Sequence, residues 1–99
     1  NVTHLYLQRN RISRIENLES LMTLNLLSLA SNCIEKVENL SGLPNLKALD
    51  LGYNKIEAVD PSDFPLTLMF LTTDGNPLSQ MDDDKWSDVY DYLPELRQH

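Results

Sequence analysis

The side chains that could act as nucleophiles or general bases are few and lie far apart along the chain. The histidines are His4 and His99, and Cys33 is the single cysteine. A hydrolytic or group-transfer enzyme needs a nucleophile, a base and an orienting group that converge on one pocket. We do not expect His4 to meet Cys33, because His4 lies in a predicted strand and Cys33 follows the next one. No phosphate-binding loop, dinucleotide fingerprint, HExxH or CxxC motif occurs, so we predict no enzymatic activity, cofactor or small-molecule substrate.

The densest group of possible metal ligands is the run from Asp82 to Asp84. A calcium-binding loop alternates its oxygen ligands around a glycine and adds a distant glutamate, and this run lacks that spacing. The apolar residues that follow recur at helical spacing; they are Trp86, Val89, Tyr90 and Leu93. Aspartates suit the positive end of a helix dipole, and Pro94 marks the end of the helix. We therefore predict no metal site, but a capping helix that lays Trp86 and Tyr90 over the preceding core.

The charge balance argues against nucleic acid and membranes as direct partners. The 99 residues carry 8 basic and 15 acidic side chains, a formal net charge of −7. Such a surface repels phosphate backbones and anionic lipid headgroups. Arg9, Arg11 and Arg14 could form a local basic patch, but three arginines are few. No run of about 18 apolar residues could span a membrane, and a lone cysteine fits a reducing compartment.

A 22-residue repeat organises most of the chain. Its clearest marker is an asparagine that recurs at this interval, as Asn10, Asn32, Asn54 and Asn76. Apolar residues keep the same period, and the unit reads L-x-x-L-x-L-x-x-N-x-I-x-x-I-x-x-L-x-x-L. Units of this length stack so that each one contacts only its neighbours. The sequence therefore predicts a solenoid.

Each unit is predicted to begin with a short strand. Leu5, Tyr6 and Leu7 alternate apolar and outward-facing positions, which is typical of a strand with one buried face. Stacked units place these strands in one parallel sheet. The repeating asparagine then satisfies backbone groups in the turn, because its amide both donates and accepts hydrogen bonds. Ile12 and Ile15 begin the return path along the convex side.

The third unit departs from the repeat in its return path. The period requires an apolar residue at Ser62, but the chain instead places Phe64 two residues later, between Pro61 and Pro65. We predict that Phe64 takes the core position after a local shift. The two prolines favour an irregular or 3₁₀ path over a regular helix.

The repeat also predicts the domain organisation. Repeat units lie near residues 1–21, 22–43, 44–65 and 66–81, and a cap helix and tail occupy residues 82–99. A solenoid exposes apolar edges at its ends unless they are capped. Because the first strand has no cap before it in this sequence, we expect an N-terminal cap or an earlier repeat in a longer parent protein.

The side chains that alternate with the inward leucines face the concave side of the predicted sheet. Leu26, Ala48 and Phe70 form a shallow apolar trough there, with an aromatic and charged rim. An exposed apolar surface with such a rim is typical of a protein-binding site and could hold a helix or loop of a partner. Scattered exposed apolar residues also occur without a function. The predicted partner-binding residues are His4, Tyr6, Gln8, Arg9, Leu26, Ser28, Ala48, Asp50, Tyr53, Phe70, Thr72 and Asp74.

Several segments resemble the 22-residue subclass of eukaryotic leucine-rich repeats. They are Ile15-Glu16-Asn17-Leu18, Val37-Glu38-Asn39-Leu40, Leu43-Pro44-Asn45-Leu46 and, as a C-terminal cap, Gly75-Asn76-Pro77 with Tyr90-x-x-Leu93-Pro94-x-Leu96. This subclass includes the repeat subunit that regulates protein phosphatase 1, an axonemal dynein light chain and dynein assembly factors. Phe64-Pro65 is most similar to a small repeat protein of motile cilia and sperm flagella.

The repeat and the resemblance predict an α/β leucine-rich-repeat solenoid of about four units, with a parallel concave sheet and a C-terminal capping helix. The resemblance implies a non-catalytic scaffold or adaptor that binds proteins within a ciliary or flagellar axoneme, in the cytoplasm. Two alternatives stay open. One is a regulatory subunit that binds a protein phosphatase, and the other is a protein-binding subunit of a nuclear ribonucleoprotein.

Overall fold

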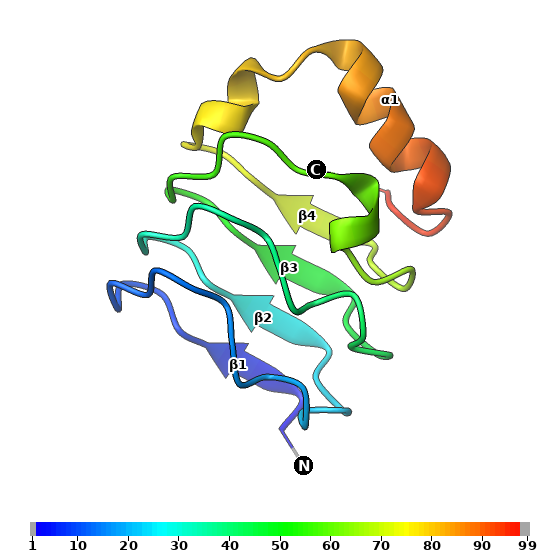
Figure 1. The fold of residues 1–99 in the computed structure, drawn as a ribbon. Coiled ribbons are helices and arrows are strands. Elements are labelled where there is room, and N and C mark those ends of the chain that lie inside the picture. Colours follow the sequence, from blue (N-terminus) through cyan, green and yellow to red (C-terminus); the bar gives the residue numbers. More distant parts are fainter. Residues whose placement is uncertain (1, 98–99) are drawn as a thin grey trace.

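The chain winds in successive coils, each of which contributes one short strand to a single sheet (Figure 1). The structure is a computed structural model that describes residues 2–97, apart from the side chain of residue 79. The strands are β1 (His4–Tyr6), β2 (Leu26–Ser28), β3 (Ala48–Asp50) and β4 (Phe70–Thr72). They are parallel and lie in the order β1-β2-β3-β4. Leu5 pairs with Leu27 and Leu27 with Leu49, so the register confirms the parallel sheet predicted from the repeat.

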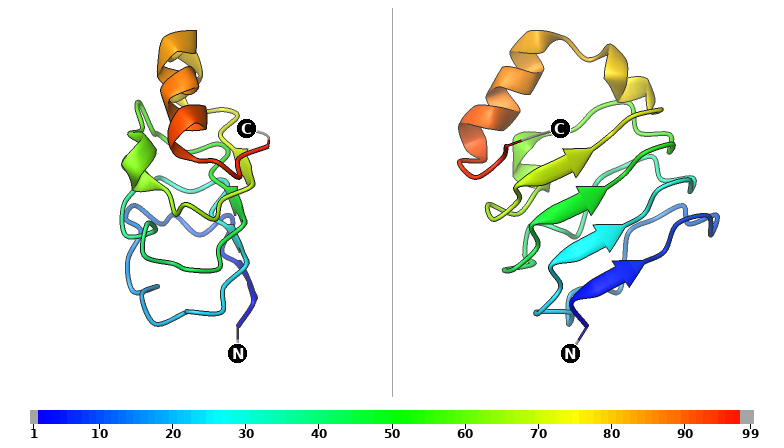
Figure 2. Two further views of the ribbon diagram at one scale, coloured as in Figure 1. Left: turned by 90° about the vertical axis from the view of Figure 1, so that its right-hand side faces the viewer. Right: turned by 180° about the vertical axis from the view of Figure 1, so that it is seen from behind.

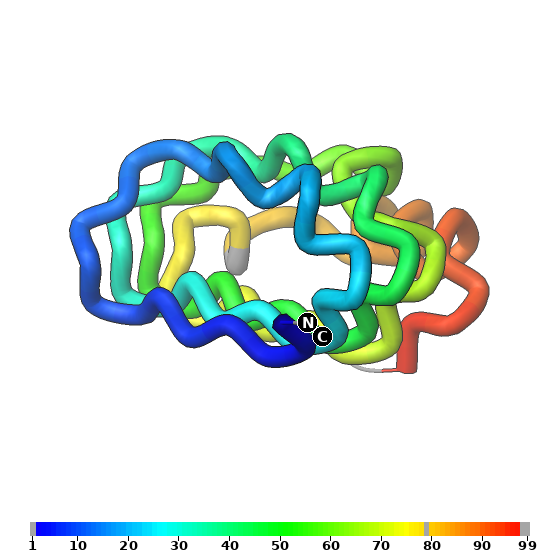
Figure 3. The backbone as a smooth tube through the Cα atoms, turned by 90° about the horizontal axis from the view of Figure 1, so that it is seen from below, coloured from blue at the N-terminus to red at the C-terminus, as the bar shows by residue number. Residues whose placement is uncertain are grey.

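The sheet and the return segments form the two long sides of a flattened coil. Figure 3 shows this coil along its axis, and Figure 2 shows the sheet on one side of the stack with the return paths on the other. Three short helices interrupt the later returns; they are η1 (Pro61–Asp63), η2 (Pro77–Gln80) and α1 (Asp83–Tyr92). Helix α1 lies at the C-terminal end of the stack and contacts η1.

The core runs through the middle of the coil from one end to the other. The inward leucines of the later strands, Leu27, Leu49 and Leu71, are at most 2% exposed. Leu5 and Leu7 in the first coil are only partly buried, because a neighbouring coil covers them from one side. Full burial of a leucine side chain contributes about 1.5–3 kcal/mol. The inner coils therefore hold most of the hydrophobic stabilisation.

The third return path differs from the first two because of a proline. Asn17 and Asn39 occupy equivalent positions, 22 residues apart, and both adopt left-handed backbone angles with φ of 65° and 63°. The equivalent residue in the third coil is Pro61. Its ring fixes φ near about −65°, so this coil cannot make the same turn. Instead the chain forms the 3₁₀ helix η1, which confirms the predicted irregular return.

The side chains of Asp60, Asp63 and Phe64 stabilise this altered return path. The Asp60 carboxylate accepts a hydrogen bond from the Ser62 backbone N–H at 3.1 Å, and Asp63 accepts one from the Asp60 N–H at 2.8 Å. Phe64 is 1% exposed, whereas Ser62 faces solvent. The predicted replacement of the missing core residue by Phe64 is confirmed.

The C-terminal helix begins where the aspartate run predicted. Asp82 is its N-cap and accepts a hydrogen bond from the Lys85 N–H at 3.0 Å, and the helix ends at Tyr92, before Pro94. Val89 and Leu93 are buried, and Trp86 packs against the core with part of its surface.

Tyr90 follows the buried Val89 by one residue, so it lies about 100° further around the helix and is 37% exposed. Its predicted place over the last repeat stays a prediction. The proposed ends of the first unit and of the tail, residues 1 and 98–99, lie outside the described residues.

Candidate protein-binding face

The asparagine ladder fixes the turns that leave the sheet. Asn32 Nδ2 donates to the carbonyl of Leu29 at 2.9 Å in its own coil and to that of Leu7 at 3.0 Å in the preceding coil. Its Oδ1 accepts from the backbone N–H groups of Asn10 and Ile12, each at 2.9 Å. The asparagine satisfies backbone groups in the turn, as the sequence predicted, and the same side chain also joins two coils.

The ladder repeats in the inner coils and is incomplete in the first. Asn54 and Asn76 make the same two kinds of bond, to their own coil and to the one before. Among the described residues, the exposed Asn10 side chain donates only within its own coil, to the carbonyls of Leu7 and Gln8. The same residue type thus links two coils at three positions and serves one coil at the first.

The residue before each asparagine has a left-handed backbone. The φ angles are 62°, 57°, 57° and 77° at Arg9, Ser31, Tyr53 and Gly75. Only glycine adopts this conformation without steric cost. At position 75 a side chain would also collide with the Tyr53 ring, which lies against the glycine. Arg9 and Tyr53 are both exposed at this turn edge.

The first column of outward-facing residues forms the apolar part of a hollow that polar side chains also line. Leu26, Ala48 and Phe70 are paired across β2, β3 and β4, and Phe70 is 45% exposed. The hollow has a volume of about 300 Å³. Its lining comprises Tyr6, Gln8, Leu26, Leu27, Ser28, Ala48, Leu49, Asp50, Phe70 and Thr72. The structure therefore brings together the apolar trough that the sequence predicted.

A second hollow of about 300 Å³ adjoins the first at the ends of the strands. It is lined by Gln8, Arg9, Ser28, Ala30, Ser31, Asp50, Gly52, Tyr53, Thr72 and Asp74. Both hollows share Gln8, Ser28, Asp50 and Thr72, so they form one continuous surface. We call this surface the concave face. His4 lies on its first column, paired with Leu26, although it lines neither hollow.

One residue of the concave face differs from its predicted state. Ser28 was expected to face solvent, yet it is only 9% exposed. It is a small side chain paired between Tyr6 and Asp50 in the same column, and those larger neighbours cover it. Ser28 therefore contributes to the floor of both hollows and not to an exposed rim.

Sequence reasoning missed a third hollow, between η1 and the cap helix. Its volume is about 310 Å³, and its lining is Val59, Asp60, Pro61, Ser62, Lys85, Asp88 and Tyr92. The Ser62 hydroxyl and then the Ser62 backbone N–H lower the pKa of Asp60 below its ordinary value of 3.8, with a smaller contribution from the Lys85 charge. Helical spacing alone could have placed Lys85, Asp88 and Tyr92 on one face, but not opposite η1.

The described residues do not assemble a reactive cluster. Cys33 is a free, half-buried thiol in a turn, whereas His4 lies on β1 and hydrogen-bonds Thr3; His99 is outside the described range. Between residues 2 and 97, no group of three or more histidine, cysteine or acidic side chains could hold a metal ion. None of the helices in that range has the length and apolar character needed to cross a membrane.

The comparison with known families agrees with this geometry. The family model described as leucine rich repeats, in two copies, matches residues 23–65. A search of curated proteins found no match to the chain. The matched repeats, the parallel sheet and the terminal helix define the class: this is a leucine-rich-repeat solenoid with a helical cap. Leucine-rich repeats are in general a non-catalytic fold that binds proteins.

Proposed function

We propose that this chain is a non-catalytic scaffold or adaptor that binds another protein on its concave face. The observation that carries the proposal is the continuous surface of two adjoining hollows, which no described segment covers. Exposed apolar ground beside aromatic and charged side chains is typical of protein-binding surfaces. The large aromatic side chains exposed on this face are Phe70, Tyr6 and Tyr53, with 45%, 60% and 66% of their surface accessible.

The size of the face limits how the partner binds. Four strands at about 4.8 Å spacing span only roughly 15 Å. A standard interface takes about 800 Å² from each partner. A partner that fills the hollows is therefore expected to extend onto the turn edge, where Arg9 and Tyr53 are exposed.

We further propose that the setting is a ciliary or flagellar axoneme, in the cytoplasm. The support is the resemblance of the repeat sequence, including Phe64-Pro65, to repeat proteins of motile cilia. Phe64 is the core residue that replaces the usual leucine in the altered third return, so this sequence feature has a defined structural role.

Affinity capture with the intact protein tests both parts. Leu26→Asp with Phe70→Asp places two charges in the apolar hollow, and Leu66→Asp is the matched control, because Leu66 is 58% exposed and lines neither hollow. We expect the wild type and the control to capture axonemal proteins and the double variant to lose them.

The other outcomes separate the site from the setting. If the double variant still captures axonemal proteins, the binding site does not lie on the concave face. Capture of a phosphatase or of splicing factors through the same residues keeps the binding face and replaces the ciliary setting with one of the two alternatives.

A further inference from the structure

We infer that the concave face recognises an amphipathic helix of its partner that carries a lysine or arginine one turn away from an apolar anchor. The apolar anchor occupies the hollow at Leu26, Ala48 and Phe70, and the cation lies between Asp50 and Asp74. This inference rests on the proposed protein-binding function and adds the chemistry of the bound segment.

The first step is the charge of the second hollow. Asp50 and Asp74 both line it, and within the described residues neither carboxylate forms an ion pair. The Asp50 Oδ1 atom accepts a hydrogen bond from the Gly52 N–H at 2.9 Å, which fixes the direction of that carboxylate. The Asp74 side chain is exposed. An oriented carboxylate beside an exposed one, in a chain of net charge −7, favours a cationic side chain.

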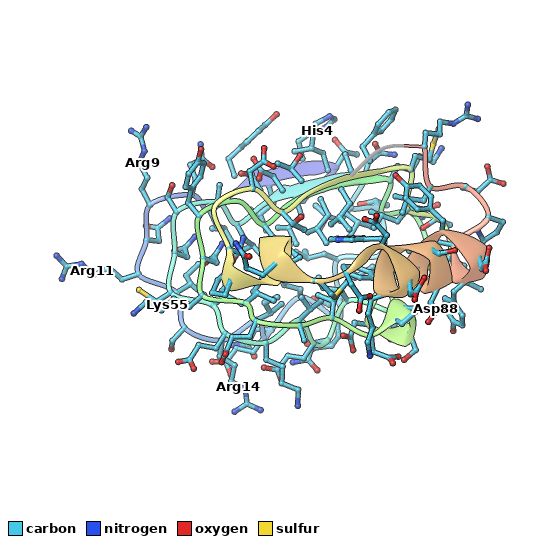
Figure 4. All side chains as sticks on the ribbon, turned by 90° about the horizontal axis from the view of Figure 1, so that it is seen from above. His4, Arg9, Arg11, Arg14, Lys55 and Asp88 are labelled. Atoms are coloured by element: carbon cyan, nitrogen blue, oxygen red, sulfur yellow. The ribbon has the colours of Figure 1, made fainter. Side chains whose placement is uncertain are left out.

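The second step is that the charged side chains of the second hollow lie on different coils. Figure 4 shows Arg11 and Lys55 extending sideways from the turn edge and Arg14 on the convex side, whereas Arg9 points to the same side as His4. Arg9 belongs to the first coil, while Asp50 and Asp74 belong to the third and fourth coils. The later coils therefore present apolar residues at the start of their strands and carboxylates at the end, and a matching partner has the complementary pair of groups.

The third step is the distance between the two hollows. Ala48 and Asp50 are two residues apart in β3, and their side chains point to the same face. Two residues along a strand span about 6.6 Å. Residues at positions i and i+4 of a helix lie about 6 Å apart along its axis and on the same side. One turn of a helix therefore carries an apolar and a basic side chain at the spacing that the two hollows present.

A selection experiment tests this chemistry without a known partner. The probe is a displayed library of stapled helical peptides in which one face is randomised among leucine, phenylalanine, arginine, glutamate and glutamine. The bait is the intact protein, and the Leu26→Asp/Phe70→Asp variant removes peptides that bind elsewhere. We expect enriched peptides to carry an apolar residue with arginine three or four positions away.

Charge variants of the protein then measure the acidic contribution. Asp50→Asn with Asp74→Asn is expected to weaken the enriched peptides by about ten-fold or more, since close charge pairs at interfaces commonly contribute this much. The matched control is Asp88→Asn with Asp91→Asn, which removes the same charge from the cap helix and is expected to change binding less than about two-fold. If the double variant is unstable, Asp74→Asn alone can be used, because this exposed side chain makes no hydrogen bond among the described residues. It is also expected to weaken binding of the enriched peptides.

The failures of the two proposals are distinguishable. Enriched peptides that depend on Leu26 and Phe70 but are neutral or acidic would overturn the cationic helix and leave the concave binding face intact. Enriched basic peptides that bind equally well to the asparagine variants would also overturn it. If no peptide distinguishes the wild type from the Leu26→Asp/Phe70→Asp variant, the inference and the concave face both fail.

Discussion

The first coil and the inner coils of this solenoid contain the same residue types at the same positions, yet these residues differ in what they contribute. Asn54 is 7% exposed and joins its own coil to the one before, whereas Asn10 is exposed and serves only its own. Leu49 is 2% exposed, whereas its counterpart Leu5 is only partly buried. In a stack where each unit contacts only its neighbours, the energetic value of a residue depends on the coils on both sides of it.

The largest difference is expected between the inner and the first leucines of the sheet. Leu49→Ala leaves a cavity in a closed core and should lower the free energy of unfolding by about 2–5 kcal/mol. Leu5→Ala removes the same atoms from a half-exposed site, where water fills the space, and should cost less than half as much. Urea denaturation of both variants provides the measurement. Equal losses would show that the first coil is as well packed as the inner ones.

The asparagine ladder gives the next largest contrast. Asn54→Ala removes the partner of the Leu29 and Leu51 carbonyls and of the Ile34 N–H, and should cost about 1–3 kcal/mol or more. Asn10→Ala exposes the Leu7 and Gln8 carbonyls to water, which replaces the lost donor, so its cost should stay below about 1 kcal/mol. Denaturant unfolding of both variants gives the two losses in the free energy of unfolding, from the midpoints if the slopes are equal. The ratio of these losses measures how much of the stabilisation by the asparagines comes from bonds between coils. A ratio near one would refute this role.

The sequence predicted those parts of the fold that depend on the repeat itself. The parallel register, the inward leucines and the asparagine in each turn follow from a period that is read along the chain, and the aspartate run predicted the cap at Asp82. The sequence did not predict features that depend on neighbours from other coils. Asn32 also binds the preceding coil, and Ser28 is buried in its column between Tyr6 and Asp50.

The candidate site was predictable to the same extent. Alternation along the strands placed Leu26, Ala48 and Phe70 on one face, and the structure joins them in one hollow. The repeat also placed Asp50 and Asp74 on the charged rim of this face, and the structure shows both lining one adjoining hollow. The hollow beside η1 arises where Pro61 alters the repeat, and a periodic pattern contains no information about it.

A smaller effect is expected at the left-handed turn of the inner coils. Ser31 has a φ of 57°, which glycine adopts without strain, so Ser31→Gly should raise stability by about 0.5–1 kcal/mol. The control is Ser13→Gly, an exposed residue outside the set with positive φ, where added backbone freedom should lower stability by a similar amount. Thermal unfolding of the two variants should therefore shift in opposite directions. Shifts of the same sign would show that the turn is not strained at Ser31.

The smallest effect is expected in the altered third coil, where the helix η1, capped by Asp60, replaces the left-handed turn of the first two coils. Hydrogen bonds from Ser62 lower the pKa of Asp60 in the folded chain, so the charged form is favoured by folding. The Asp60 carboxylate therefore adds its full contribution to folding stability above the pKa of about 3.9 in the unfolded chain. This contribution is lost as the pH falls through the lower pKa in the folded chain.

The stability difference between wild type and Asp60→Asn should accordingly be present at neutral pH and shrink as the pH falls below about 4. Because Asp60 is exposed, the difference should be small, and salt should reduce it further. Ser62→Ala removes the largest cause of the pKa shift and should reduce the pH dependence, without changing the left-handed turns at Asn17 and Asn39. The part that survives is expected from the Ser62 backbone N–H, which the variant keeps, and a pH dependence unchanged in Ser62→Ala would show that the hydroxyl is not the main cause.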